Sequence, residues 1–187
     1  MVAMLENPEI RRLVGKISVQ EYEQLGGDVD GIRRELIRGV LIEEMAPSPP
    51  HSFLITRLYR WILAAAGRDL YCRQEQPLRL SDSMPQPDLA VIGGSEEDYF
   101  DAHPSTALWV MEVAISSTVL DREKASLYAE AGIKEYWILL VEERAVEVHT
   151  APQAGKYAQR KVYRSGETLV SAAVPTLHVD LEALFRR

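Results

Sequence analysis

An acidic residue, Glu112, stands inside the apolar run Leu-Trp-Val-Met-Glu-Val-Ala-Ile at residues 108–115. Such a run is typical of a strand that is buried on both faces. Because an unpaired carboxylate in a protein core is costly, Glu112 should have a cationic partner, such as a core arginine, or a metal ion. In an extended strand Glu112 shares its face with Ala114, whose small side chain leaves room for a ligand beside the carboxylate.

A second acid, Asp88, follows Pro87 and begins the apolar run 88–92. Proline cannot donate a hydrogen bond to a sheet, so it marks the start or the edge of a strand. Two interpretations of Asp88 stay open. It either caps a turn, a common use of aspartate after proline, or it is a second acid of a functional site.

Lys124 lies on the apolar stripe of a predicted helix. Its neighbours at i−4, i+3, i+4 and i+7 are Leu120, Leu127, Tyr128 and Ala131. Lysine is rarely buried without a partner, although its stem can lie on apolar surface while the ammonium reaches water. Only a few residues join the run 108–115 to this helix. The helix should therefore fold back over the sheet and bring the ammonium of Lys124 within reach of the acids.

Two acids and a lysine in apolar settings are typical of metal-assisted phosphodiester hydrolysis. A hard divalent cation such as Mg²⁺ binds a few carboxylate oxygens and keeps water or substrate phosphate as its other ligands. The metal polarises a phosphoryl oxygen and lowers the pKa of a bound water. A lysine stabilises the charge that develops in the transition state. The backbone carbonyl of Val113 is a candidate for one further oxygen ligand.

The chain has the periodicity of a mixed α/β protein in which helices flank a sheet. Helices are expected from a capping box at Ser18 and Glu21 to Gly26, and at 51–66, 119–131 and 181–185. Strands are expected within 35–42 on both sides of a turn at 38–39, and at 70–73, 78–80, 88–92, 108–115, 136–141, 146–149, 156–163 and 168–170. The middle of the chain thus runs helix, three strands, helix, strand. This order predicts a mixed sheet between helices, with extra antiparallel strands at both ends.

Composition predicts one domain over residues 1–187, with 1–16 as a flexible N-terminal extension. Apolar residues make up 47% and charged residues 26%, as in ordinary globular proteins. The single cysteine, Cys72, excludes an internal disulfide, and no signal or membrane-spanning pattern is seen, so we expect a cytoplasmic protein. The net charge of −7 argues against a surface that binds nucleic acid throughout, but it is compatible with binding in a local cleft.

Several stretches together resemble the PD-(D/E)XK nuclease superfamily and, within it, the Uma-two family of restriction endonuclease-like proteins. The matching stretches are 35–39, 46–51, 87–91, 112–118, 121–124 and 128–137. Their order and spacing carry the resemblance, which covers the chain from about residue 18 to 185. It implies a restriction endonuclease-like αβββαβ core, in agreement with the order of elements above.

The resemblance implies a role for each charged residue. Asp88 and Glu112 are similar to the metal-binding acids of the family, and Glu35 to a further acid from the N-terminal region. Many superfamily members have the catalytic lysine at the position that is Ala114 here. Lys124 on the next helix resembles a migrated replacement. The implied catalytic set is thus Asp88, Glu112, Lys124 and Glu35, and the implied metal ligands are Asp88, Glu112 and Val113.

Three further residues are candidates for lining the site. His51 matches a family position at the start of the first long helix, although a histidine in a proline-rich helix entry is an equally good interpretation. Gln74 and Glu75 precede the Asp88 strand and either line the cleft or belong to an exposed strand end. Asp121 suits the first turn of its helix because of the helix dipole.

The leading hypothesis is a metal-dependent endonuclease that cleaves DNA with Mg²⁺ or Mn²⁺. By analogy with restriction-type enzymes, which need two sites to cut two strands, it is expected to be a homodimer. Two alternatives stay open: a nuclease-fold binding module without useful turnover, and a hydrolase of small phosphoesters. The net acidity favours the alternatives, whereas three charges in apolar positions favour the enzyme.

Overall fold

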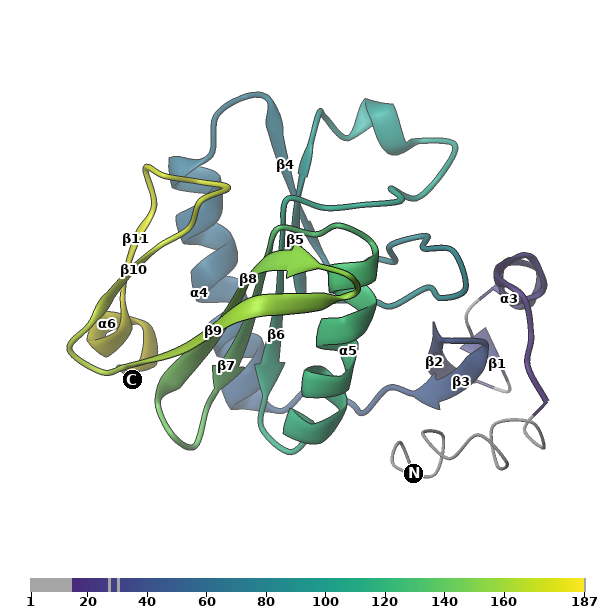
Figure 1. Ribbon diagram of the computed structural model, residues 1–187, viewed down its shortest axis with the longest axis horizontal. Helices are drawn as coiled ribbons and strands as arrows, with labels where there is room; N and C mark the ends of the chain where they lie inside the picture. The colour runs from purple at the N-terminus through teal and green to yellow at the C-terminus, as the bar shows by residue number, and fades with distance from the viewer. Residues whose placement is uncertain (1–14, 27, 30, 187) are drawn as a thin grey trace.

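A six-stranded mixed sheet forms the centre of the structure, a computed structural model that describes residues 15–26, 28–29 and 31–186 (Figure 1). Its strands, in spatial order, are β4 (Leu70–Gln74), β5 (Leu89–Gly93), β6 (Trp109–Ala114), β7 (Glu135–Leu140), β8 (Ala145–Gln153) and β9 (Lys156–Arg164). Neighbouring strands are antiparallel except for β6 and β7, which are parallel. A parallel pair requires a crossover connection, and here a helix provides it.

Two helices cover the two faces of this sheet (Figure 1): α4 (Pro49–Ala65) on one and α5 (Thr118–Glu130) on the other. Alternation along β6 divides its side chains between two cores. Trp109, Met111 and Val113 pack in the core that includes α4. Val110 and Ala114 pack in the core that includes α5. Glu112 therefore projects toward α5, and the order α4-β4-β5-β6-α5-β7 confirms the expected αβββαβ core.

Smaller elements flank the core at both ends of the chain. They are α3 (Val19–Leu25), β1 (Asp28–Val29), β2 (Ile32–Ile37), β3 (Val40–Glu43), the 3₁₀ helix η1 (Glu97–Tyr99), β10 (Thr168–Val170), β11 (His178–Asp180) and α6 (Leu181–Phe185). The capping box of α3 is present, since Ser18 and Glu21 satisfy each other's backbone N–H groups. A bridge between Leu36 and Met84 ties β2 to the segment that precedes β5.

The predicted strand at 78–80 is wrong. Leu78 and Leu80 are buried, which explains the strand-like alternation in the sequence. Their backbone N–H groups donate instead to Pro85 and Ser83 within a tight loop between β4 and β5. Helix α4 also begins two residues before the expected His51, because Pro49 and Pro50 occupy first-turn positions that need no backbone N–H.

The predicted N-terminal extension lies outside the described residues, apart from Gly15 and Lys16. Cys72 is buried and free. Across the described ranges, no helix has the combination of length and apolar character that crossing a bilayer demands.

Glu147 on β8 fixes the position of α5 against the sheet. Its buried carboxylate accepts hydrogen bonds from Arg122 of α5 at 2.8 Å and from His149 at 2.8 Å, and it also binds Arg160 of β9. Burial alone would raise the pKa of Glu147, but the bonds from Arg160, Arg122 and His149 outweigh it and lower the pKa to about 2. The helix that carries Lys124 is thus held to the sheet by a charged cluster.

We predict that Glu147→Gln destabilises the protein by about 2 kcal/mol at neutral pH, a figure reduced for the solvent exposure of the two arginines. A lowered pKa contributes stability above the unfolded-state pKa of about 4.3, and the contribution is lost as the pH falls toward 2. Urea midpoints measured at decreasing pH should therefore show the gap between wild type and variant closing. The exposed Glu143→Gln is the control, and a gap that stays constant with pH would contradict this assignment.

Candidate active site

Lys124 is buried between two carboxylates from different parts of the chain. Its Nζ atom lies 2.8 Å from Oε1 of Glu35 on β2 and 3.1 Å from Oε1 of Glu112 on β6. The exposed fractions of Lys124, Glu35 and Glu112 are 5%, 3% and 4%, so the ammonium does not reach solvent. The structure thus brings together three residues that the sequence singled out, Lys124, Glu35 and Glu112.

Further contacts fix the orientation of Glu112. Its Oε1 atom accepts a hydrogen bond from the hydroxyl of Tyr128 at 3.0 Å, and its Oε2 atom accepts one from the backbone N–H of Asp88 at 3.3 Å. The sequence interpretation treated Tyr128 only as a core residue. Its spacing of four residues from Lys124, on the same helix face, was the signal that pointed to the site.

The charges of this cluster are set by burial and by mutual attraction. Burial raises the pKa of Glu112 well above its usual range, and the ammonium of Lys124 only partly opposes this. For Lys124, burial favours the neutral amine, but Glu112 and Glu35 more than compensate and raise its pKa. Lys124 is therefore charged, and Glu112 has a stronger tendency to hold a proton than an exposed glutamate has.

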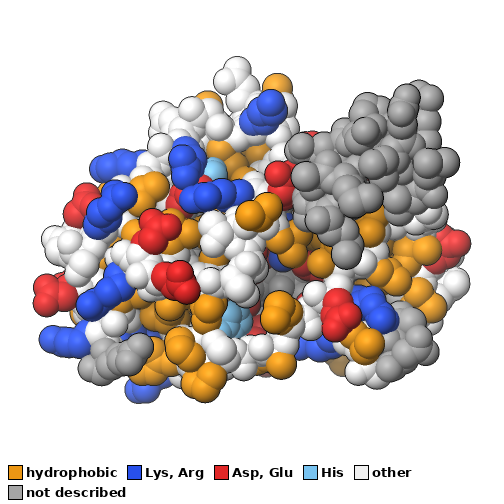
Figure 2. All heavy atoms as spheres, turned by 90° about the horizontal axis from the view of Figure 1, so that it is seen from below, with side chains coloured by type: hydrophobic (Ala, Val, Ile, Leu, Met, Phe, Trp, Pro, Cys, Tyr) orange, Lys and Arg blue, Asp and Glu red, His pale blue; other side chains and the backbone are white. Residues whose placement is uncertain are grey.

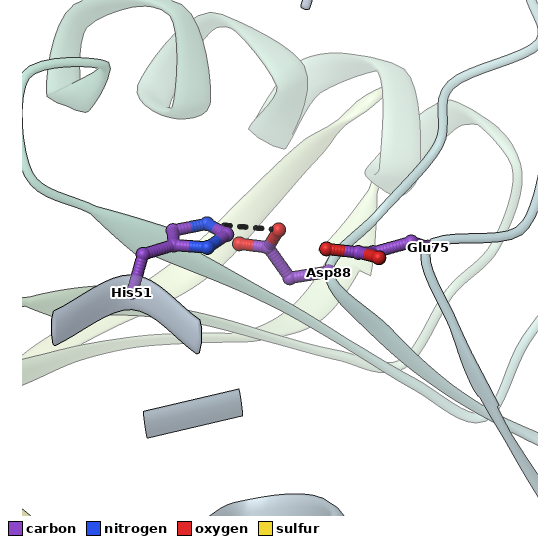
Figure 3. A group of neighbouring side chains, drawn as sticks. All are labelled: His51, Glu75 and Asp88. Carbon is purple, nitrogen blue, oxygen red and sulfur yellow. Dashed lines mark ion pairs between the residues drawn. The ribbon is translucent and has the colours of Figure 1, made fainter. Parts of the chain in front are cut away.

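Asp88 connects this cluster to a second group of side chains (Figure 3). Its Oδ1 atom lies 3.1 Å from Nε2 of His51, in the first turn of α4, and its Oδ2 atom accepts the backbone N–H of Val113 at 2.6 Å. Figure 3 shows the Asp88 carboxylate between the imidazole of His51 and the carboxylate of Glu75. One ligand atom from each of His51, Glu75 and Asp88 lies within 4.8 Å of the others.

The two ring nitrogens of His51 have different surroundings, since only Nε2 is paired with Asp88. The hydrogen bond to Asp88 raises the pKa of His51, and burial works against it. Its other ring nitrogen, Nδ1, is buried without a hydrogen-bond partner in the described part of the chain. Glu75 reaches the group from the end of β4, where its backbone N–H donates to the carbonyl of Asp88 at 3.1 Å.

Asp121 lies near the site and has surroundings that the sequence does not indicate. Asp121 is in the first turn of α5 as expected, but it is buried rather than solvated, and burial raises its pKa to about 6. Its carboxylate accepts a hydrogen bond from the hydroxyl of Ser117 at 2.6 Å.

Gln74 is exposed on β4 opposite Leu89. The side chain of Val113 packs in the α4 core. The roles of Gln74 as site lining and of the Val113 carbonyl as a ligand stay predictions.

On the described part of the face in Figure 2, basic and acidic side chains are interspersed among hydrophobic ones. A protein that binds nucleic acid over a whole face has a basic stripe or patch there. The mixed surface instead agrees with the expectation, drawn from the net charge of −7, that any polyanion binds in a local cleft.

We predict that Lys124→Met destabilises the protein by about 3 kcal/mol or more at pH 7, because Glu35 and Glu112 then face each other without a cation. The pKa of such a pair is raised in the folded state, so the lost stability should be partly regained as the pH falls. Chemical denaturation of wild type and variant at several pH values measures this. The exposed Lys134→Met is the matched control, and an equally small loss in both variants would refute the buried triad.

Comparison with known proteins identifies the family and the fold. The family model Uma2, described as "Putative restriction endonuclease", matches residues 19–182. No curated protein matches the chain. A solved structure described as a "putative nuclease belonging to DUF820", from Anabaena variabilis ATCC 29413, is similar with a TM-score of 0.76 and 19% identity, over 90% of this chain and 97% of that chain. At this identity the likeness shows the fold. Because the family model spans most of its length, the chain belongs to the Uma2 family of restriction endonuclease-like proteins.

Proposed function

We propose that the protein is a divalent-metal-dependent endonuclease that hydrolyses DNA phosphodiester bonds. The observation that carries this proposal is the buried Lys124 ammonium, held by Glu35 and Glu112 beside the backbone of Asp88. A scaffold without catalytic use gains little from burying such a triad, since apolar residues of similar volume would be as stable or more so. Membership of a nuclease family supports the same reaction class.

The donor atoms of the site fit a divalent metal ion. His51, Glu75 and Asp88 offer one nitrogen and two carboxylate oxygens within 4.8 Å of one another. Asp88 and Glu112 are both expected as metal ligands, and Asp88 belongs to this group. The oxygens of Glu112 accept hydrogen bonds from Lys124, Tyr128 and the backbone N–H of Asp88. Carboxylates suit Mg²⁺ and Mn²⁺, and an imidazole favours a transition-metal ion over Mg²⁺. When bound, such an ion supplies a Lewis acid for a phosphoryl oxygen and lowers the pKa of water.

The remaining residues position groups and balance charge. Lys124 balances the carboxylates of Glu35 and Glu112, and its positive charge behind the site favours the negative charge that develops on the phosphoryl group. Tyr128 orients Glu112 through its hydroxyl, and Val113 orients Asp88 through its backbone N–H. These supports come from a helix and a strand, so the reacting carboxylates are held by the most rigid parts of the fold.

A plasmid-nicking assay tests the proposal. Wild-type protein with Mn²⁺ or Mg²⁺ should convert supercoiled plasmid to nicked or linear forms, and EDTA should prevent this. Asp88→Asn, Glu112→Gln and Lys124→Ala should each reduce the rate by about 100-fold or more, since Asp88→Asn and Lys124→Ala remove charges and Glu112→Gln removes the carboxylate that pairs with Lys124. The exposed Glu123→Gln and Lys134→Ala are matched controls that should cleave like wild type.

The outcomes separate the alternatives. Cleavage that survives all three site substitutions would show a contaminating nuclease. DNA binding without cleavage, at any metal tested, would favour the binding module. Hydrolysis of a small phosphoester such as p-nitrophenyl phosphate, with intact plasmid, would favour the small-phosphoester hydrolase.

We further propose a homodimer, because one site per chain must act on two strands. Sedimentation velocity at micromolar concentration should give twice the mass of the 187-residue chain. A monomer at that concentration, with plasmid cleavage intact, would contradict the dimer and point to single-strand nicking. A cytoplasmic location stays a prediction.

A further inference from the structure

Arg73 on β4 carries a buried charge that no carboxylate of the described residues neutralises. The residue is 3% exposed. Its Nη2 group donates to Nδ1 of His103 at 2.9 Å, and the guanidinium carbon lies 5.9 Å from the ring centre of Tyr99. Its Nε and Nη1 groups are buried and have no hydrogen-bond partner in the part of the chain that the structure describes. An arginine with unused buried donors is costly, so an anionic partner is indicated.

His103 connects Arg73 to a cavity. The cavity has a volume of about 250 Å³, and its lining includes His103, Arg33, Gln86 and Tyr22. His103 belongs to the segment between β5 and β6 and is exposed, so the side chain that contacts the buried guanidinium of Arg73 also borders the cavity. The lining also includes Glu23, but Arg79 binds this carboxylate at 2.7 Å and balances its charge.

We propose that Arg73 and His103 form a binding site for a phosphate group at this cavity. The planar guanidinium presents parallel N–H groups that match two oxygens of a phosphate, and the imidazole offers a further donor. Arg33 adds a second guanidinium at the cavity wall, although Glu44 shares its charge at 3.2 Å.

The location of Arg73 suggests which phosphate it binds. Arg73 on β4 lies two residues before Glu75, which directly follows the strand. It pairs with Ala90, which lies two residues after Asp88. Two residues of a strand span about 6.6 Å, which is close to the spacing of adjacent phosphates along a nucleic acid strand. A strand whose scissile phosphate is at Asp88 would therefore have a neighbouring phosphate near Arg73. This choice of DNA as the source rests on the proposed function, whereas the phosphate site itself does not.

The sign of a stability change tests the site. In phosphate-free buffer, Arg73→Met should match or exceed the melting temperature of wild type, because it removes an unpaired buried charge. Inorganic phosphate should raise the melting temperature of wild type and leave that of Arg73→Met unchanged. His103→Gln, a change at an exposed residue, should weaken phosphate binding by about tenfold in calorimetry. The exposed Arg60→Met, on α4, should behave as wild type.

A DNA arm separates the two sources of phosphate. Binding of a short fluorescent duplex is measured in EDTA, so that no cleavage occurs. Arg73→Met should weaken this binding by about tenfold, and Arg60→Met should not. If the phosphate effect depends on Arg73 but duplex binding does not, the site takes free phosphate and the DNA assignment is wrong. Neither measurement requires turnover. A protein that does not nick plasmid would therefore contradict the proposed function but not the proposed phosphate site.

The opposite stability result would overturn the proposal. If Arg73→Met lowers the melting temperature with and without phosphate, and the phosphate-induced rise persists, Arg73 has only a structural role beneath the segment between β5 and β6.

Discussion

The attraction between the Lys124 ammonium and the carboxylates of Glu35 and Glu112 is the interaction on which the candidate site depends. Each of the three groups would be unfavourable alone, because removing a charge from water is costly. Together they satisfy one another at 2.8 and 3.1 Å in a setting where electrostatic interactions are strong. Burial also disfavours the charged form of each carboxylate, and it therefore raises the pKa values of both Glu112 and Asp121.

The fold brings these charges together from four separate segments. Glu35 comes from the small N-terminal sheet, Asp88 from the residue just before β5, Glu112 from β6 and Lys124 from the crossover helix. The parallel pairing of β6 and β7 requires a crossover, and the crossover helix α5 packs on the face toward which Glu112 projects. Glu147 with its two arginines then holds α5 in place on that face. The site is therefore a consequence of topology as much as of local sequence.

The core of this arrangement could be predicted from periodicity. An apolar run with one acid located Glu112 in a buried strand, and the lysine on an apolar helix stripe located Lys124 opposite it. Glu35 was accessible only through the family resemblance, because its strand shows no apolar surroundings as clear as those of Glu112. The strand predicted at 78–80 failed because buried leucines alternate in a loop as they do in a strand, and alternation alone does not report where the backbone N–H groups donate. Tyr128 was missed because a tyrosine on a core stripe is usually an ordinary core residue. Arg73 was missed because an arginine in a strand acquires a role only from partners distant in sequence.

The placement of the lysine on α5 has a consequence for how the site is assembled. A lysine at position 114 would stay near Glu112 in any extended strand, even one that had not yet joined a sheet. The chain does not by itself keep Lys124 near Glu112, since the two residues are 12 positions apart in the sequence. The charged centre therefore exists only after the helix has docked, and any transient detachment of α5 would disperse it. In this protein the ion pair between Lys124 and Glu112 therefore forms only when α5 is packed on the sheet.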